Sequence, residues 1–156
     1  MRMRSCLLAL LFLTVPASRA QDYGKDVRAH VLGKADTTAF GQKIVYPVVS
    51  HPQVTALEVE IPPGGETGWH THPFPGYAYV LAGELTLESR QGKLRTFVAG
   101  ETILESVNLA HNGRNLGPVP VRLVAFFTGD SGRAVTVLLP ASGRNPQQKK
   151  QQKANP

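Results

Sequence analysis

Apolar and polar residues alternate with a period of two along the middle of this chain, a pattern typical of β-strands. The clearest case is the segment 54–61, where Leu57, Val59 and Ile61 fall on one side and two glutamates fall on the other. This segment predicts a strand with one face in a core and the other in solvent.

Further short apolar segments follow, separated by turns rich in glycine and proline. Turn signals every eight to twelve residues or so are typical of an antiparallel sandwich or barrel. No segment of convincing length repeats with the period of a helix, so we expect an all-β domain. In the segment 43–49, Pro47 indicates an edge strand or a bulge. Strands are predicted at residues 43–49, 54–61, 77–81, 85–89, 94–98, 102–104, 121–128 and 135–139.

The N-terminal residues 1–20 have the pattern of a secretory signal: arginines first, then an apolar run, then small residues before Gln21. The apolar run, about ten residues long, is too short to span a hydrocarbon core of about 30 Å as a helix. Cleavage after Ala20 would remove Cys6, the only cysteine, and leave neither a disulfide nor a thiolate ligand. We therefore expect a periplasmic or secreted protein with no membrane span after cleavage.

The rest of the 156-residue chain is long enough for one domain. We expect an N-terminal arm at residues 21–42, a barrel at 43–140, and a disordered tail at 141–156, where no large apolar residue occurs. The signal and the tail hold seven of the 17 basic residues, which leaves ten against 11 acidic ones. With a nearly neutral domain and no nucleic-acid-binding motif, we expect no nucleic-acid partner.

Three of the five histidines lie between Gly64 and Asn115. His70 and His72 are two residues apart, so a strand would place both rings on one face. Histidine is the commonest protein metal ligand, and His111 is the candidate for a third imidazole in the same pocket. The sequence therefore predicts a metal site formed by these three residues.

At this point the chain resembles the cupin superfamily, whose first motif is a glycine, a His-x-His pair, a glutamate and a closing glycine at fixed spacing. Gly64, His70, His72 and Gly83 fit that motif. The glutamate position falls on Gly76, so the carboxylate ligand usual in the family is missing from it.

The second motif of the family places a glycine, a Pro-x-Gly element, a histidine and an asparagine in order. Gly100, His111 and Asn115 match it, whereas the proline and the inner glycine are replaced by Ser106 and Asn108. The resemblance covers roughly residues 43–139. It implies a single-domain jelly-roll barrel, the double-stranded β-helix.

The resemblance further implies an open three-histidine site for one divalent transition metal: Fe, Mn, Zn, Ni or Cu. An exported enzyme with dioxygenase- or isomerase-like chemistry on a small organic molecule would use such a site. A non-catalytic module that binds a small ligand or a metal is the alternative, and a decayed site is a third. Barrels of this kind often pair through edge strands, so we expect a homodimer.

Other side chains could complete the site. Glu66 has the same strand parity as His70 and is the first candidate for a replacement carboxylate. Glu84 is expected at a solvent-facing turn, and Glu105 at the rim of the pocket. Tyr77 and Asn115 are further candidates for a ligand or for support of the ligands. Without the motif glutamate, the site is predicted to be more open and more cationic than is usual in the family, and to bind its metal less tightly.

Overall fold

The computed structural model of the chain describes residues 26–140, which contain no helix. Contacts divide the chain into two units, Met1–Val31 and Leu32–Pro156, and all nine strands belong to the second unit. In the first unit, the described residues 26–31 form neither a strand nor a helix. The signal predicted at 1–20 and the tail predicted at 141–156 lie outside the described residues.

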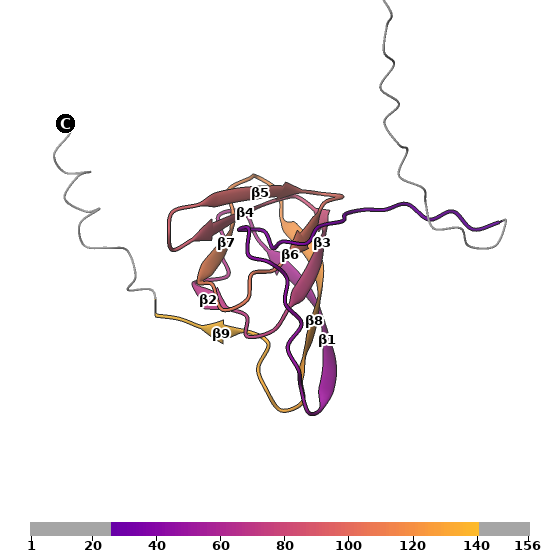
Figure 1. Ribbon diagram of the computed structural model, residues 1–156. Coiled ribbons are helices and arrows are strands. Elements are labelled where there is room, and N and C mark those ends of the chain that lie inside the picture. The colour runs from indigo at the N-terminus through magenta and orange to yellow at the C-terminus, as the bar shows by residue number, and fades with distance from the viewer. Residues whose placement is uncertain (1–25, 141–156) are drawn as a thin grey trace, which may run out of the picture. The chain divides into compact units, whose positions relative to one another are not determined.

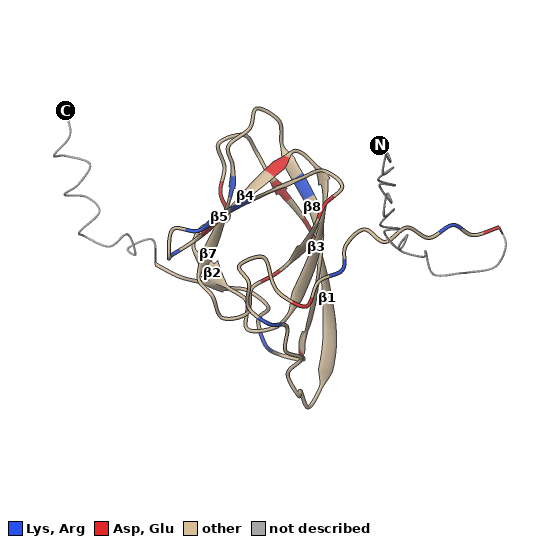
Figure 2. Ribbon diagram, turned by 45° about the horizontal axis from the view of Figure 1, so that its top comes forward, with Lys and Arg blue, Asp and Glu red and all other residues tan. Residues whose placement is uncertain are grey.

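The strands form two antiparallel sheets that face each other across a shared interior (Figures 1 and 2). The first sheet has the order β1-β8-β3-β6, with β1 at Pro52–Ile61, β8 at Val121–Asp130, β3 at Gly76–Ala82 and β6 at Thr102–Leu104. The second has the order β5-β4-β7-β2-β9, with β5 at Leu94–Val98, β4 at Glu84–Ser89, β7 at His111–Asn115, β2 at His70–Thr71 and β9 at Val137–Leu138. This is the jelly-roll barrel expected from the sequence.

The core lies between the sheets and follows from the period-two alternation of each strand. Strand β8 alternates buried and exposed positions along its length, and β3 does the same. Strand β1 pairs with β8 over all ten residues, and its glutamates point outward, where Glu58 forms an ion pair with Arg122. The buried apolar cluster comprises Ala39, Ile61, Ala78, Val80, Leu85, Leu87, Phe97, Ile103, Val121, Leu123, Ala125 and Phe127.

Two tight turns explain residues of the sequence motifs. Gly83 joins β3 to β4 with a φ of 77°, and a Cβ atom there would lie 2.6 Å from the carbonyl oxygen of Pro120. Only glycine avoids both the strain and the clash. Asn108, which replaces the inner glycine of the second motif, keeps a left-handed φ of 55°, because asparagine tolerates this region better than most residues.

The strand predicted at residues 43–49 does not form. Lys43 makes an isolated bridge to Thr37, and the following residues run outside the sheets, with Val45 and Tyr46 each 71% exposed. Pro47 removes a backbone donor in the middle of the segment, which weakens any pairing there. Residues 37–42, within the predicted arm, instead pack against the barrel, with Ala39 in the core and its N–H bonded to the Leu104 carbonyl.

Charged positions are interspersed around the described barrel, with basic and acidic residues on both sheets (Figure 2). Arg114 on β7, for example, lies 3.6 Å from Glu88 on β4 and 3.8 Å from Glu66. No helix among the described residues combines the length and the apolar composition needed to cross a membrane.

Candidate metal centre

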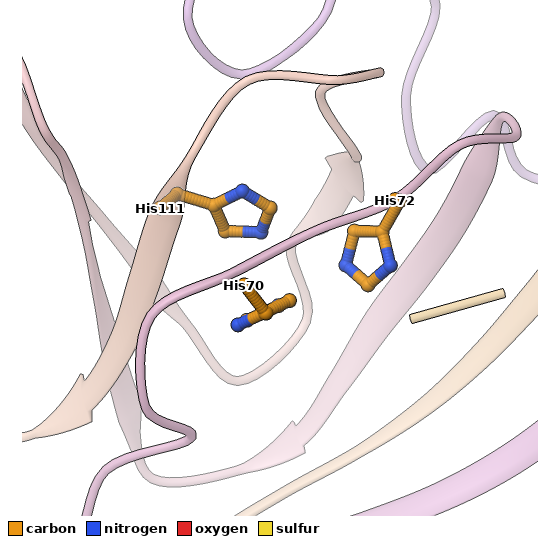
Figure 3. A group of neighbouring side chains, drawn as sticks. All are labelled: His70, His72 and His111. Carbon is orange, nitrogen blue, oxygen red and sulfur yellow. The ribbon is translucent and has the colours of Figure 1, made fainter. Parts of the chain in front are cut away.

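The structure brings the three predicted histidines together on the inner face of the five-stranded sheet. His70 begins β2 and pairs directly with His111, the first residue of β7, and His72 follows β2 with a bridge to Val107. All three side chains are buried. Their ring centroids lie 4.3 to 5.2 Å apart, and the rings converge on one space (Figure 3).

Backbone carbonyls fix the orientation of each imidazole. The Nδ1 atoms of His70, His72 and His111 lie 2.8, 2.8 and 2.9 Å from the carbonyl oxygens of Gly68, Val135 and Leu109, respectively. Because a carbonyl oxygen only accepts, we assign the ring proton of each neutral histidine to Nδ1. The Nε2 lone pairs are left for the shared space, and the candidate ligand atoms of the cluster lie within 4.8 Å of one another. Bonds of this kind are what orient histidines that ligate metals.

Burial keeps two of these histidines neutral. It lowers the pKa of His70 to about 4, although the Gly68 carbonyl works in the opposite direction. Burial also lowers the pKa of His72, although the carboxylate of Glu105 and the Val135 carbonyl both act to raise it. Neutral imidazoles are the form that binds a metal, so both residues are ready to bind one at neutral pH.

A carboxylate does reach this pocket, although the first motif provides none. Glu105, placed at the rim by the sequence, lies just after β6, and its Oε2 atom is 3.5 Å from Nε2 of His111. Its side chain is only 11% exposed, and within the described residues Oε2 has no hydrogen-bond partner.

The charges of Glu105 and His111 are coupled. Burial would raise the pKa of Glu105, but the neighbouring His111 outweighs it and the pKa is lowered. Burial would lower the pKa of His111, but the neighbouring Glu105 outweighs burial and the pKa is raised. Each group therefore favours the charged form of the other, and a metal bound at Nε2 of His111 would compete with a proton there.

The remaining candidates lie outside the cluster. Glu66, the first choice from sequence, is 56% exposed on its side chain and accepts a hydrogen bond from Asn112. Tyr77 faces the other side of β3, where burial and a hydrogen bond with Tyr46 raise its pKa to about 12. Asn115 is buried, but it bonds to the carbonyls of Ile61 and Val119 and so fixes the chain at the end of β7.

The histidines open into a cavity of about 190 Å³ inside the barrel. Most of its wall is apolar, and its polar groups are the three histidines, Glu105, Thr67 and Thr136. Among the described residues, no lysine or arginine lines it. Glu105 also borders a second hollow of about 280 Å³ formed by residues 38–47 and the start of β3.

These donors fit a divalent transition metal. Imidazole nitrogen suits Fe, Mn, Zn, Ni and Cu, whereas Ca²⁺ and Mg²⁺ prefer all-oxygen sites. A buried carboxylate oxygen without a donor is also the kind of group that a cation satisfies. The residues present therefore suggest a metal ion, with its identity open.

Two contributors escape the sequence patterns. Thr67 accepts a hydrogen bond from the Gly113 N–H through its hydroxyl and bonds the Gly113 carbonyl through its own N–H, so it ties the chain before β2 to β7. Phe127 of β8 packs on the His72 ring at a centroid distance of 4.5 Å. Neither residue type signals a metal site by itself, because both are common in ordinary strands.

The sequence profile of the cupin domain family matches residues 57–127, which run from β1 into β8 and include all three histidines. The segment 57–127 of the barrel therefore matches the cupin domain family, and the resemblance drawn from the two histidine motifs is confirmed. No curated protein sequence is significantly similar to the chain.

Several solved structures resemble the barrel. The DMSP lyase DddQ of Ruegeria pomeroyi DSS-3 is 24% identical with a TM-score of 0.50, over 58% of this chain and 45% of the lyase. A recombinant oxalate oxidase in complex with glycolate is 29% identical (TM-score 0.47), over 55% of this chain and 45% of the oxidase. A cupin domain from Bordetella pertussis Tohama I is 28% identical (TM-score 0.44), over 49% of this chain and 81% of that domain. This chain thus spans less than half the length of the lyase and the oxidase, and the similarity to the lyase shows a shared fold.

Proposed function

We propose that this protein is an exported metal-dependent cupin that binds one divalent transition metal through His70, His72 and His111 and acts on a small organic molecule in the barrel. The observation that carries the proposal is the set of three Nδ1–carbonyl bonds, which leave three Nε2 lone pairs directed into one buried space. A packed core has no need for three imidazoles oriented in this way.

When bound, such a metal polarises a carbonyl or enolate oxygen or activates dioxygen, which fits dioxygenase- or isomerase-like chemistry. The walls of the cavity decide what reaches it. Leu57, Leu123 and Phe127 are among the apolar residues that line the space. With no lysine or arginine of the segment 26–140 in its wall, the cavity favours a neutral molecule or one with a single anionic group. Its size is below the ~300–1,000 Å³ of pockets for drug-sized ligands, so the substrate is small.

A specific observation favours the alternative, a non-catalytic module that binds a small ligand or a metal. The titratable residues lining the cavity are the three histidines and Glu105. If all of them contact the metal, no separate acid or base remains beside a substrate. A candidate ligand recovered unchanged after long incubation with the metal-loaded protein would support this module, and its turnover would exclude it.

Metal content tests the proposal. Elemental analysis of the protein purified from its native compartment should find about one transition-metal ion per chain. The double variant H70A/H72A should lose nearly all of it, because a single imidazole and a carboxylate hold these metals weakly. The matched control is H51A, which removes an exposed histidine outside the cluster. Full loading of the double variant would reject these ligands, and metal-free wild type would reject the function.

Export is part of the proposal, and its support is the signal pattern of residues 1–20. Cell fractionation with N-terminal sequencing would test it, the expected mature N-terminus being Gln21. A homodimer formed through edge strands is a further proposal, which light scattering on the purified protein would test.

A further inference from the structure

We propose that Glu105, which directly follows β6, is a fourth ligand of the metal in place of the glutamate that the first motif lacks at Gly76. The inference rests on the proposed function and names a ligand outside the His-x-His segment. Three independent features of the described residues support it: strand register, the filling of the Gly76 position, and the unpartnered oxygen of Glu105.

Register places Glu105 directly across from Gly76. Strands β3 and β6 pair as Tyr77 with Leu104 and Ala78 with Ile103, and one further step brings Gly76 opposite Glu105. The Glu105 N–H donates to the Gly76 carbonyl at 2.8 Å, which confirms that step. Opposite residues in an antiparallel pair point to the same face, about 4.5–5.5 Å apart at Cβ. A carboxylate at position 105 therefore enters the same cavity that a carboxylate at position 76 would enter.

The place of a side chain at position 76 is already taken. A Cβ atom on Gly76 would lie 2.3 Å from Cε1 of Phe127, whose ring packs on His72. The motif glutamate and Phe127 thus exclude each other in this barrel. The substitution of glutamate by glycine makes room for the aromatic ring while the opposite strand provides the carboxylate.

The Glu105 carboxylate is placed as a ligand would be. Two ligand atoms bound to one ion at about 2.0–2.2 Å are separated by roughly 2.8–3.6 Å, and Oε2 lies 3.5 Å from Nε2 of His111. Oε2 is buried and makes no hydrogen bond among the described residues, and the cationic partner within its reach is His111, itself a proposed ligand. A metal ion among the three Nε2 atoms would replace the proton of His111 as that cationic partner.

The test titrates metal-free protein with Co²⁺ and follows its visible absorption, which reports the number and geometry of ligands. For E105Q, which keeps the size of the side chain, we expect the dissociation constant to rise by about 100-fold or more, together with a changed spectrum. The matched control is E66Q, which alters the half-exposed carboxylate outside the cavity and should leave both readouts as in wild type.

The possible results distinguish a failure of the Glu105 assignment from a failure of the proposed metal-binding function. Unchanged affinity and spectrum in E105Q would overturn the ligand assignment and leave the three-histidine site standing. Weaker binding with the wild-type spectrum would also overturn it, because Glu105 would then act only through His111. Failure of wild type to bind Co²⁺, Zn²⁺ or Fe²⁺ would overturn both. Circular dichroism of each variant establishes that it is folded.

Discussion

At the scale of single residues, Gly76 and Phe127 form a matched pair. The lack of a side chain at position 76 allows the Phe127 ring to lie against His72. From the sequence, Gly76 indicates only the loss of a ligand. In the structure it is also a packing residue, because any Cβ atom there would overlap a buried ring.

The substitution G76A should therefore be costly. Overpacking forces either Phe127 or the strand to shift, and we expect a loss of about 1–3 kcal/mol in the free energy of unfolding, measured by urea denaturation. The matched control is G117A, whose new Cβ would lie 3.5 Å from the Asn115 Oδ1 atom, an ordinary contact. Equal stability of the two variants would show that Phe127 moves aside without cost.

At the scale of elements, the site depends on how the chain before β2 is joined to β7. The two strands share a single residue pair, His70 with His111. Thr67 strengthens this short contact, since its hydroxyl accepts the Gly113 N–H at 2.9 Å and its own N–H donates to the Gly113 carbonyl at 2.8 Å. The alignment of two ligands thus depends on a residue that is not itself a ligand.

The isosteric substitution T67V removes the hydroxyl and leaves the Gly113 N–H without that acceptor. We expect a loss of about 1–3 kcal/mol in stability and about tenfold weaker Co²⁺ binding, measured by urea denaturation and by titration. The control T86V alters a threonine on β4 that is more deeply buried than Thr67 and whose hydroxyl makes one long contact of 3.4 Å to Thr96. If T67V bound Co²⁺ as tightly as T86V, Thr67 would have no positioning role.

At the scale of the whole molecule, the barrel buries its histidines at a cost that depends on pH. The pKa of His70 is lowered to about 4 by burial, and that of His72 is lowered as well. Between pH 6.5 and 4 the unfolded chain therefore binds protons that these folded residues do not, and stability falls as pH falls. His111, with a raised pKa, contributes in the opposite direction: its stabilisation is present below pH 6.5 and is lost as pH rises through its folded pKa.

The metal-free protein should accordingly lose stability on acidification from pH 7 to pH 4. His70 alone accounts for about 3 kcal/mol of this loss, from a pKa difference of roughly 2.5 units. Urea denaturation at pH 7, 5.5 and 4 measures it. H70N should show a smaller pH dependence than wild type, whereas H51A, at the exposed histidine, should follow wild type. An identical pH dependence of stability in H70N and wild type would contradict the assignment of this loss to His70.

The sequence by itself determined the three histidines and most of the strands, because both depend on local patterns. The short strands β2 and β7, which carry His70 and His111, are not among the predicted strands. Period-two alternation places Leu57, Val59 and Ile61 inward whatever the rest of the chain does, and the spacing of His70 and His72 places both rings on one face. Where alternation was weak and proline intervened, at residues 43–49, the predicted strand was wrong. The fold class needed only the succession of short strands and turns.

Tertiary structure alone decided the fourth side chain of the site. Strand parity with His70 favours Glu66, yet parity says nothing about which strands lie side by side. Glu105 reaches the pocket because β6 pairs with β3 in the register that sets it opposite Gly76, and Phe127 fills the vacated place because β8 pairs with β3 on the other side. Register between distant strands depends on the packing of the whole barrel, so the pattern within any one strand does not contain it.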